Sequence, residues 1–149
     1  MTADDVALAL GAAFSVEDHG EYGEITDADD ALVALVGYDP LQIEVDLSVV
    51  LAVAEDAVQD AAESADRLLR EAQLAPWIAE GFVPAELGAV YEGESADDPE
   101  SGVLSYDLPV TSLARDADHL RALVALAVRL PRDFALWGPN GPLTVLERV

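Results

Sequence analysis

The chain lacks both cysteine and lysine. Without cysteine, disulfide bonds, thiolate metal sites and cysteine nucleophiles are all excluded. Without lysine as well, few nucleophiles remain. The sequence also has no glycine-rich phosphate loop, no dinucleotide-binding fingerprint and no serine elbow of the G-x-S-x-G type. We therefore expect a protein that is not an enzyme, with no catalytic residues and no cofactor.

Long hydrophobic runs are missing too. The longest uncharged apolar runs cover residues 31–38 and 47–54. A helix needs about 20 such residues to cross a bilayer. The N-terminus lacks the basic start of an export signal. We therefore expect a cytoplasmic protein with no membrane partner.

Negative charge dominates the composition. Thirty Asp and Glu residues stand against seven Arg in 149 residues, a formal net charge of -23. Carboxylates at this density repel one another at low ionic strength, whereas at 1 M salt the screening length is only about 3 Å. The charge therefore indicates an adaptation to brine, and we interpret the chain as a protein of a halophilic cytoplasm.

The same charge bears on nucleic acids. Direct binding needs a basic footprint for the phosphates, and none is present, so we expect no nucleic-acid partner. A different possibility is that the acidic surface mimics a nucleic acid. Mimicry requires carboxylates in rows, and this alternative stays open.

Apolar periodicity predicts the elements of the N-terminal half. A helix is expected over residues 3–13, starting at a capping box formed by Thr2 and Asp5. An acidic edge strand is expected within residues 15–30. A hairpin follows, in which a strand at 32–38 turns at Pro40 into the clearest strand of the chain, residues 41–53, with alternating apolar and polar positions.

The C-terminal half is predicted to begin with a helix over about 57–73. Its ion pairs, Glu63 with Arg67 and Asp66 with Arg70, should point outward. Pro76 should close it, before an irregular stretch. Four further segments are then expected: strands at 87–92 and 103–110, an acidic mobile loop at 93–102 between them, and a helix at 113–130 that buries Leu113, Ala117, Leu120, Val124, Ala127 and Leu130.

These elements predict an α+β protein in which helices pack on one face of an antiparallel sheet, in the order α-βββ-α-ββ-α. The length predicts a single domain over residues 1–149. Its core should span residues 3–130, and residues 131–149 should form a C-terminal tail.

His19 is the most suggestive ligand-type residue. It is surrounded by Glu17, Asp18 and Glu21, and a cluster of His and carboxylates can hold a divalent ion. Consecutive strand residues point to opposite faces, however, so these four cannot all converge without a loop. We therefore interpret His19 as a surface residue and expect no metal site. His119 should lie at the boundary or surface of its helix.

The aromatic and apolar stretch after Pro76 has two interpretations. Its members Trp77, Ile78, Phe82 and Val83 could pack in the core, as aromatic clusters commonly do. They could instead form an exposed groove for a partner segment or for a second copy of the chain. In the second interpretation, Trp137 could fill that groove in the resting state. We take these five residues as the candidate partner-binding site.

The element order resembles that of type III secretion chaperones and of the related YbjN-like bacterial domains. The stretches that carry the likeness are residues 49–56, leading into the second helix, and residues 100–109, leading into the third. The likeness covers about residues 3–130. It implies a homodimeric, non-enzymatic protein that holds another polypeptide or acts as a regulator. Residues 76–86 and the segment after 131 have no obvious counterpart.

The sequence therefore favours a non-enzymatic, protein-binding domain of chaperone-like or regulatory type. Its expected partners are another polypeptide and a second copy of itself, with the contact surface on the second helix or on residues 77–83. The alternative is an enzyme or small ligand-binding domain whose pocket lies between the sheet and the helices.

Overall fold

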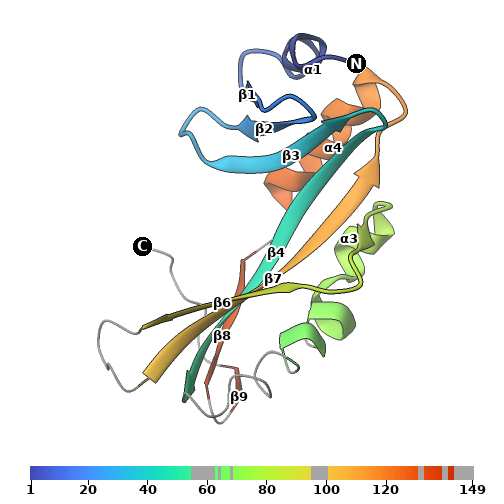
Figure 1. Ribbon diagram of the computed structural model, residues 1–149. Coiled ribbons are helices and arrows are strands. Elements are labelled where there is room, and N and C mark those ends of the chain that lie inside the picture. The colour runs from blue at the N-terminus through green and yellow to red at the C-terminus, as the bar shows by residue number, and fades with distance from the viewer. Residues whose placement is uncertain are drawn as a thin grey trace. The chain divides into compact units, whose positions relative to one another are not determined.

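The computed structural model describes residues 1–54, 63, 65–67, 69–94, 101–130, 133–138 and 141–142. It confirms an α+β fold with an open, mainly antiparallel sheet (Figure 1). The chain divides into two compact units. The first unit comprises Met1–Val45, Gly81–Val83 and Val110–Pro131, and the second comprises Asp46–Glu80, Pro84–Pro109 and Arg132–Val149.

The first unit begins with helix α1 (Ala3–Leu10). The predicted capping box is confirmed. The Asp5 N–H donates to the Thr2 hydroxyl at 3.2 Å, and the Thr2 N–H donates to the Asp5 carboxylate at 2.9 Å. The helix ends earlier than residue 13 because Gly11 takes a φ of 80°, a left-handed conformation that glycine adopts at little cost.

The acidic segment expected to form one edge strand forms a hairpin of two strands, β1 (Ser15–Asp18) and β2 (Tyr22–Thr26). Gly20 supplies the turn with a φ of 97°, and its N–H donates to the Asp18 carboxylate at 2.9 Å. Short side chains that bond the backbone two residues on are typical of tight turns. The acidic residues therefore form the turn as well as the surface.

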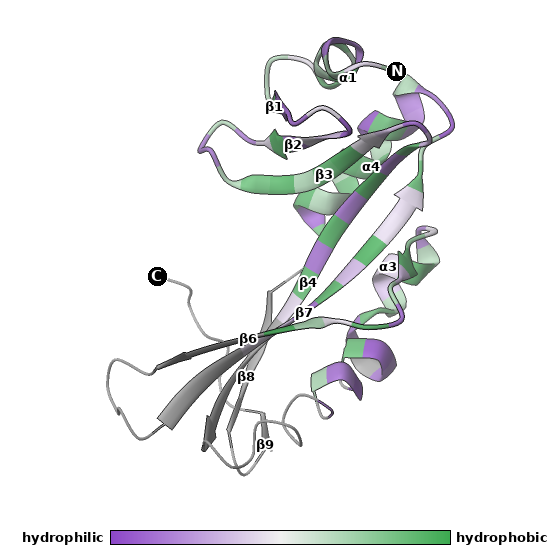
Figure 2. Ribbon diagram, viewed as in Figure 1, coloured by the Kyte–Doolittle hydropathy of each residue, from purple (hydrophilic) through white to green (hydrophobic). Residues whose placement is uncertain are grey.

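The next hairpin is confirmed. Strand β3 (Leu32–Tyr38) pairs antiparallel with strand β4 (Leu41–Ala54). Along β4 the side chains of Ile43, Val45 and Leu47 are buried. The alternation with polar residues is visible as successive bands in Figure 2. This period of two is why the segment forms a strand and not a helix.

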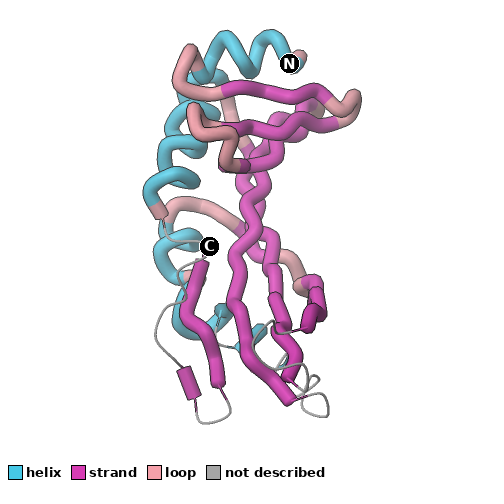
Figure 3. Tube along the Cα trace, turned by 90° about the vertical axis from the view of Figure 1, so that its left-hand side faces the viewer, coloured by secondary structure: helices cyan, strands magenta, loops and turns pink. Residues whose placement is uncertain are grey.

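Two helices cover one face of this sheet. Helix α4 (Ala117–Arg129) packs on β3, and α1 packs against both α4 and β1 (Figures 1 and 3). The core between them includes Val6, Leu10, Ile25, Val36, Ile43, Leu120, Leu123 and Val124.

Helix α4 begins four residues later than predicted because Asp116 caps it, its carboxylate accepting the His119 N–H at 2.8 Å. The prediction that Leu113 points inward is wrong. Leu113 ends strand β7 (Ser101–Leu113) and is 61% exposed. His119 lies half-buried in the first turn, and its Nδ1 accepts the Arg115 N–H at 2.9 Å.

The second unit contains the π-helical turn η2 (Leu69–Gln73) and the short helix α3 (Ala75–Ala79). About half of the helix predicted at 57–73 lies outside the described residues; of the rest, Glu63 and residues 65–67 are helical and Leu69–Gln73 form the π-helical turn. Pro76 lies in the first turn of α3, where its missing N–H costs nothing. It therefore starts a new helix, and the stretch that follows it is helical at first.

Strands β6 (Ala89–Glu94) and β7 form the predicted antiparallel hairpin, and the short strand β5 (Val83–Pro84) lies next to β7. Residues 95–100 of the predicted loop lie outside the described residues. The segment expected to be a tail instead contributes strands. Strand β8 (Asp133–Gly138) pairs parallel with β4, and β9 (Gly141–Pro142) pairs with β8.

Among the described residues, no helix is both long and apolar enough to span a membrane.

Candidate functional site

Strand register separates the two faces of the sheet in the first unit. Residues paired across antiparallel strands lie on the same face. The buried face holds Gly23 opposite Val36, Ile25 opposite Ala34, and Val36 opposite Ile43. These residues face the helices.

The opposite face presents two rows of side chains. In the first row Glu17 pairs with Glu24, Glu24 with Leu35, and Leu35 with Glu44. In the second row Gly37 lies between Tyr22 and Gln42. None of these residues is buried. We call this surface the open face, defined by Glu17, Tyr22, Glu24, Leu35, Gly37, Gln42 and Glu44.

The open face is hollowed into a depression of about 240 Å³, lined by Tyr22, Leu35, Val36, Gly37, Gln42 and Glu44. Gly37 contributes to the hollow because it has no side chain between Tyr22 and Gln42. Enclosed sites for small ligands are commonly about 300–1,000 Å³ and deep. The lining combines apolar surface, an amide and one carboxylate, and it includes neither His nor Arg. The depression therefore offers an apolar surface with an amide and a carboxylate beside it.

A cluster of ligand-type side chains lies at the β1–β2 end of the open face. One ligand atom from each of Glu17, His19 and Glu24 lies within 4.8 Å of the other two. The Nε2 atom of His19 lies 3.4 Å from the nearest Glu24 oxygen. The imidazole stacks on the Tyr22 ring, with centroids 5.0 Å apart. His19 therefore lies at the surface, as predicted, but it faces two carboxylates.

Only part of the acidic group proposed from the sequence belongs to this cluster. Asp18 points to the other face, where its carboxylate accepts a hydrogen bond from the Tyr38 hydroxyl at 3.1 Å. Burial raises the pKa of Tyr38, and the contact with Asp18 raises it further. Glu24, which lies on the next strand, completes the cluster. Only the register, which pairs it with Glu17, shows that it belongs.

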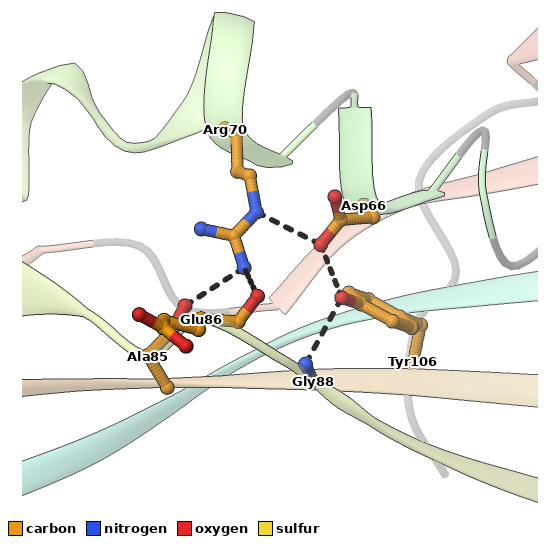
Figure 4. A network of polar contacts seen from close by, with 6 residues as sticks. All are labelled: Asp66, Arg70, Ala85, Glu86, Gly88 and Tyr106. Carbon is orange, nitrogen blue, oxygen red and sulfur yellow. Dashed lines mark hydrogen bonds and ion pairs between the residues drawn. The ribbon is translucent and has the colours of Figure 1, made fainter.

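The second unit contains a different polar group, shown in Figure 4. The Arg70 Nε donates to the Asp66 carboxylate at 2.9 Å, and its Nη2 donates to the carbonyls of Ala85 and Glu86, each at 2.7 Å. The same Asp66 oxygen accepts the Tyr106 hydroxyl. That hydroxyl also accepts the Gly88 N–H at 3.2 Å.

Two ion pairs were predicted to point outward from the second predicted helix, and the structure differs from both predictions. Asp66 and Arg70 do pair one turn apart, but they are half-buried against β7 and the chain before β6, and do not point outward. The described residues Glu63 and Arg67 do not form the other expected pair. Burial raises the pKa of Tyr106, and its hydrogen bond to Asp66 adds to the rise. Because its donors and acceptors bond within the chain, the network stabilises the fold.

The residues proposed for partner binding do not form one exposed surface. Trp77 and Phe82 are buried, whereas Ile78 is 52% and Val83 64% exposed. Trp77 and Ile78 belong to the second unit, while Phe82 and Val83 belong to the first. Core packing therefore explains Trp77 and Phe82. Trp137 lies in β8, opposite Leu51 of β4, and its side chain lies outside the described residues.

No protein-family model, curated protein or solved structure matches this chain.

Proposed function

We propose that this protein is a non-enzymatic, polypeptide-binding domain of chaperone-like or regulatory type, and that it binds through the open face. The observation that carries the proposal is an aromatic ring and an apolar side chain on a sheet face whose described residues are not buried. Tyr22 is 42% exposed, and it lines the depression together with Leu35. Tyrosine at a shallow apolar surface is typical of the centre of protein interfaces.

The charges of the open face suggest the chemistry of the partner. Glu17, Glu24 and Glu44 surround the apolar centre, so a complementary segment carries Arg or Lys beside one or two apolar side chains. Leu35 interrupts the row of carboxylates. That interruption gives no support to the alternative of a nucleic-acid mimic, which needs a continuous row.

We also retain the proposal of a homodimer, formed through another surface. In a two-fold dimer the same patch meets itself. If the open face formed this contact, its carboxylates would face one another, which is unfavourable. Helices α1 and α4 pack together and expose Leu8 and Val128, which are 85% and 54% accessible. We propose this helical surface for self-association, and sedimentation of the L8S variant in multimolar KCl tests it.

Photo-crosslinking tests the polypeptide-binding proposal. A photoreactive phenylalanine analogue is introduced at Tyr22 or at Gln42, and in a control at Leu8 of helix α1, which is outside the open face. We expect both open-face positions to form an adduct with the same polypeptide, and the control not to form it. In the purified pair, Y22A should weaken binding about tenfold or more. Adducts that are absent, or identical from Leu8, would contradict the proposal.

The proposal of a halophilic cytoplasm has its own test. Repulsion among the carboxylates should weaken as the screening length falls from about 30 Å at 0.01 M salt to about 3 Å at 1 M. The melting temperature should therefore rise steeply as KCl is raised to multimolar concentration. A melting temperature that stays flat or falls would contradict the interpretation.

A further inference from the structure

We propose that Glu17, His19 and Glu24 form a binding site for a divalent transition-metal ion of the Zn²⁺ type. Strand pairing places the two carboxylates side by side, because Glu17 and Glu24 are direct partners across β1 and β2. The turn between these strands places the imidazole above them. The His19 N–H donates to the Tyr22 carbonyl at 2.8 Å, which fixes the backbone from which the ring projects.

One distance within the cluster matches the spacing of two ligands around a zinc ion. Ligand atoms about 2.0–2.1 Å from a tetrahedral Zn²⁺ lie about 3.4 Å from one another. The His19 Nε2 and Glu24 oxygen are 3.4 Å apart. An N–H···O hydrogen bond is usually about 2.7–3.2 Å. The remaining separations, none above 4.8 Å, can close by side-chain rotation because Glu17 is exposed.

The ring of His19 is already oriented for this role. Stacking on Tyr22, with an angle of 22° between the ring planes, restricts the imidazole before any ligand arrives. Side chains that are held in place lose less conformational entropy when they bind. Tyr22 belongs to the open face, so the proposed ion lies beside the proposed binding surface. The inference does not depend on that function, since all three ligands come from this chain.

The ligand types select the class of ion. Imidazole nitrogen suits Zn²⁺ and its transition-metal neighbours, whereas Ca²⁺ and Mg²⁺ prefer sites made only of oxygen. Two carboxylates balance the charge of a dication. Three protein ligands leave a fourth position for water or for a group from another molecule, as in zinc sites that are not closed.

Calorimetric titration of the metal-stripped full chain with Zn²⁺ tests the site. The buffer contains 1 M KCl, so that the diffuse attraction of cations to the acidic surface is screened. We expect saturable binding of one ion per chain, and a loss of affinity of about tenfold or more in H19A and in E24Q. Two variants are matched controls: E21Q removes a neighbouring acid outside the cluster, and H119A removes the other histidine. Both should bind like the parent.

Nitrogen chemical shifts of the histidine side chains provide a second measurement. Zn²⁺ should shift the Nε2 resonance of His19 and leave His119 unchanged. The proposal is overturned if H19A and E24Q keep the parent affinity, if E21Q and H119A lose as much, or if only weak binding of several ions is seen. Since no polypeptide is present, a negative result leaves the proposed function untouched, and a failed crosslink leaves the metal site untouched.

Discussion

The two polar clusters, one in each unit, differ in how accessible their polar atoms are to a ligand. In the second unit, Asp66, Arg70 and Tyr106 satisfy one another and three backbone groups at half-buried positions. In the first unit, Glu17, His19 and Glu24 converge at the surface with a 3.4 Å contact between His19 and Glu24. Similar residue types therefore stabilise the fold in one place and remain accessible in the other.

Burial decides which role such a cluster has. A buried donor or acceptor that loses its partner costs about 1–3 kcal/mol, so loss of a partly buried member of the Asp66 network should destabilise the fold more than loss of an exposed pair. Exposed ionic contacts are worth about 0–1 kcal/mol because water replaces them. Removing a residue from the surface cluster should therefore change binding while leaving the fold almost unchanged.

The largest effect is expected from G88A. A Cβ atom at Gly88 would lie 2.4 Å from the Tyr106 ring and 2.7 Å from the Asp107 carbonyl oxygen. Backbone cannot move aside as a flexible side chain can, so we expect a loss of about 3 kcal/mol in the free energy of unfolding. Denaturant unfolding measures it. The control is G37A on the open face, where the nearest atom is the Gln42 Cγ at 3.3 Å, and its cost should stay below about 1 kcal/mol.

The next effect concerns Arg70. In R70M, the Asp66 carboxylate and the carbonyls of Ala85 and Glu86 lose their hydrogen bonds from Arg70, which should cost about 2 kcal/mol. The matched control is R121M. The Arg121–Asp118 pair has the same 2.9 Å separation, but its side chains are 57% and 89% exposed, against 29% and 35% for Arg70 and Asp66. We expect R121M to cost about 0.5 kcal/mol. Equal losses of stability in R70M and R121M, measured by thermal melts, would show that burial does not determine how much these ion pairs contribute.

Removing one hydroxyl should have a smaller effect. Y106F loses the hydrogen bonds to Asp66 and from the Gly88 N–H, about 1 kcal/mol at neutral pH.

The same variant should change the response to alkali. Burial raises the pKa of Tyr106 above its usual value of about 10. Above that value the unfolded chain releases the proton first, so it binds fewer protons than the folded chain and stability falls as the pH rises. Unfolding measured between pH 8 and 11 should therefore show a shallower alkaline loss in Y106F. If the loss of stability at alkaline pH is as steep in Y106F as in the parent, folding does not raise the pKa of Tyr106.

Features set by neighbouring residues could be predicted from the sequence. The capping box of Thr2 and Asp5, the alternation along β4 and the buried residues of α4 all depend on positions within one or two turns or pleats. Pairing over longer separations could not be predicted. The spacing of Asp66 and Arg70 indicates an ion pair, but its inward orientation depends on Tyr106, forty residues further along the chain.

The candidate site shows the same limit. The acids next to His19 were visible in the sequence, yet the tight turn at Gly20 and the register of β1 with β2 decide which of them face it. The β1–β2 hairpin therefore brings Glu24 close to His19, whereas Asp18 and Glu21 lie outside the cluster. Likewise, the spacing of the apolar residues alone could not show that Trp77 and Phe82 are buried.

The smallest change in stability is expected from H19A. His19 is at the surface and its contact with Glu24 is long, so the metal-free variant should unfold within about 0.5 kcal/mol of the parent. Zn²⁺ separates the two proteins. At an ion concentration of 100 times the dissociation constant, binding to the folded state stabilises the parent by about 2.7 kcal/mol, and H19A should gain much less. Melting temperatures with and without Zn²⁺ measure both quantities. If Zn²⁺ stabilises the parent and H19A equally, the ion binds to the acidic surface in general and not to the surface cluster.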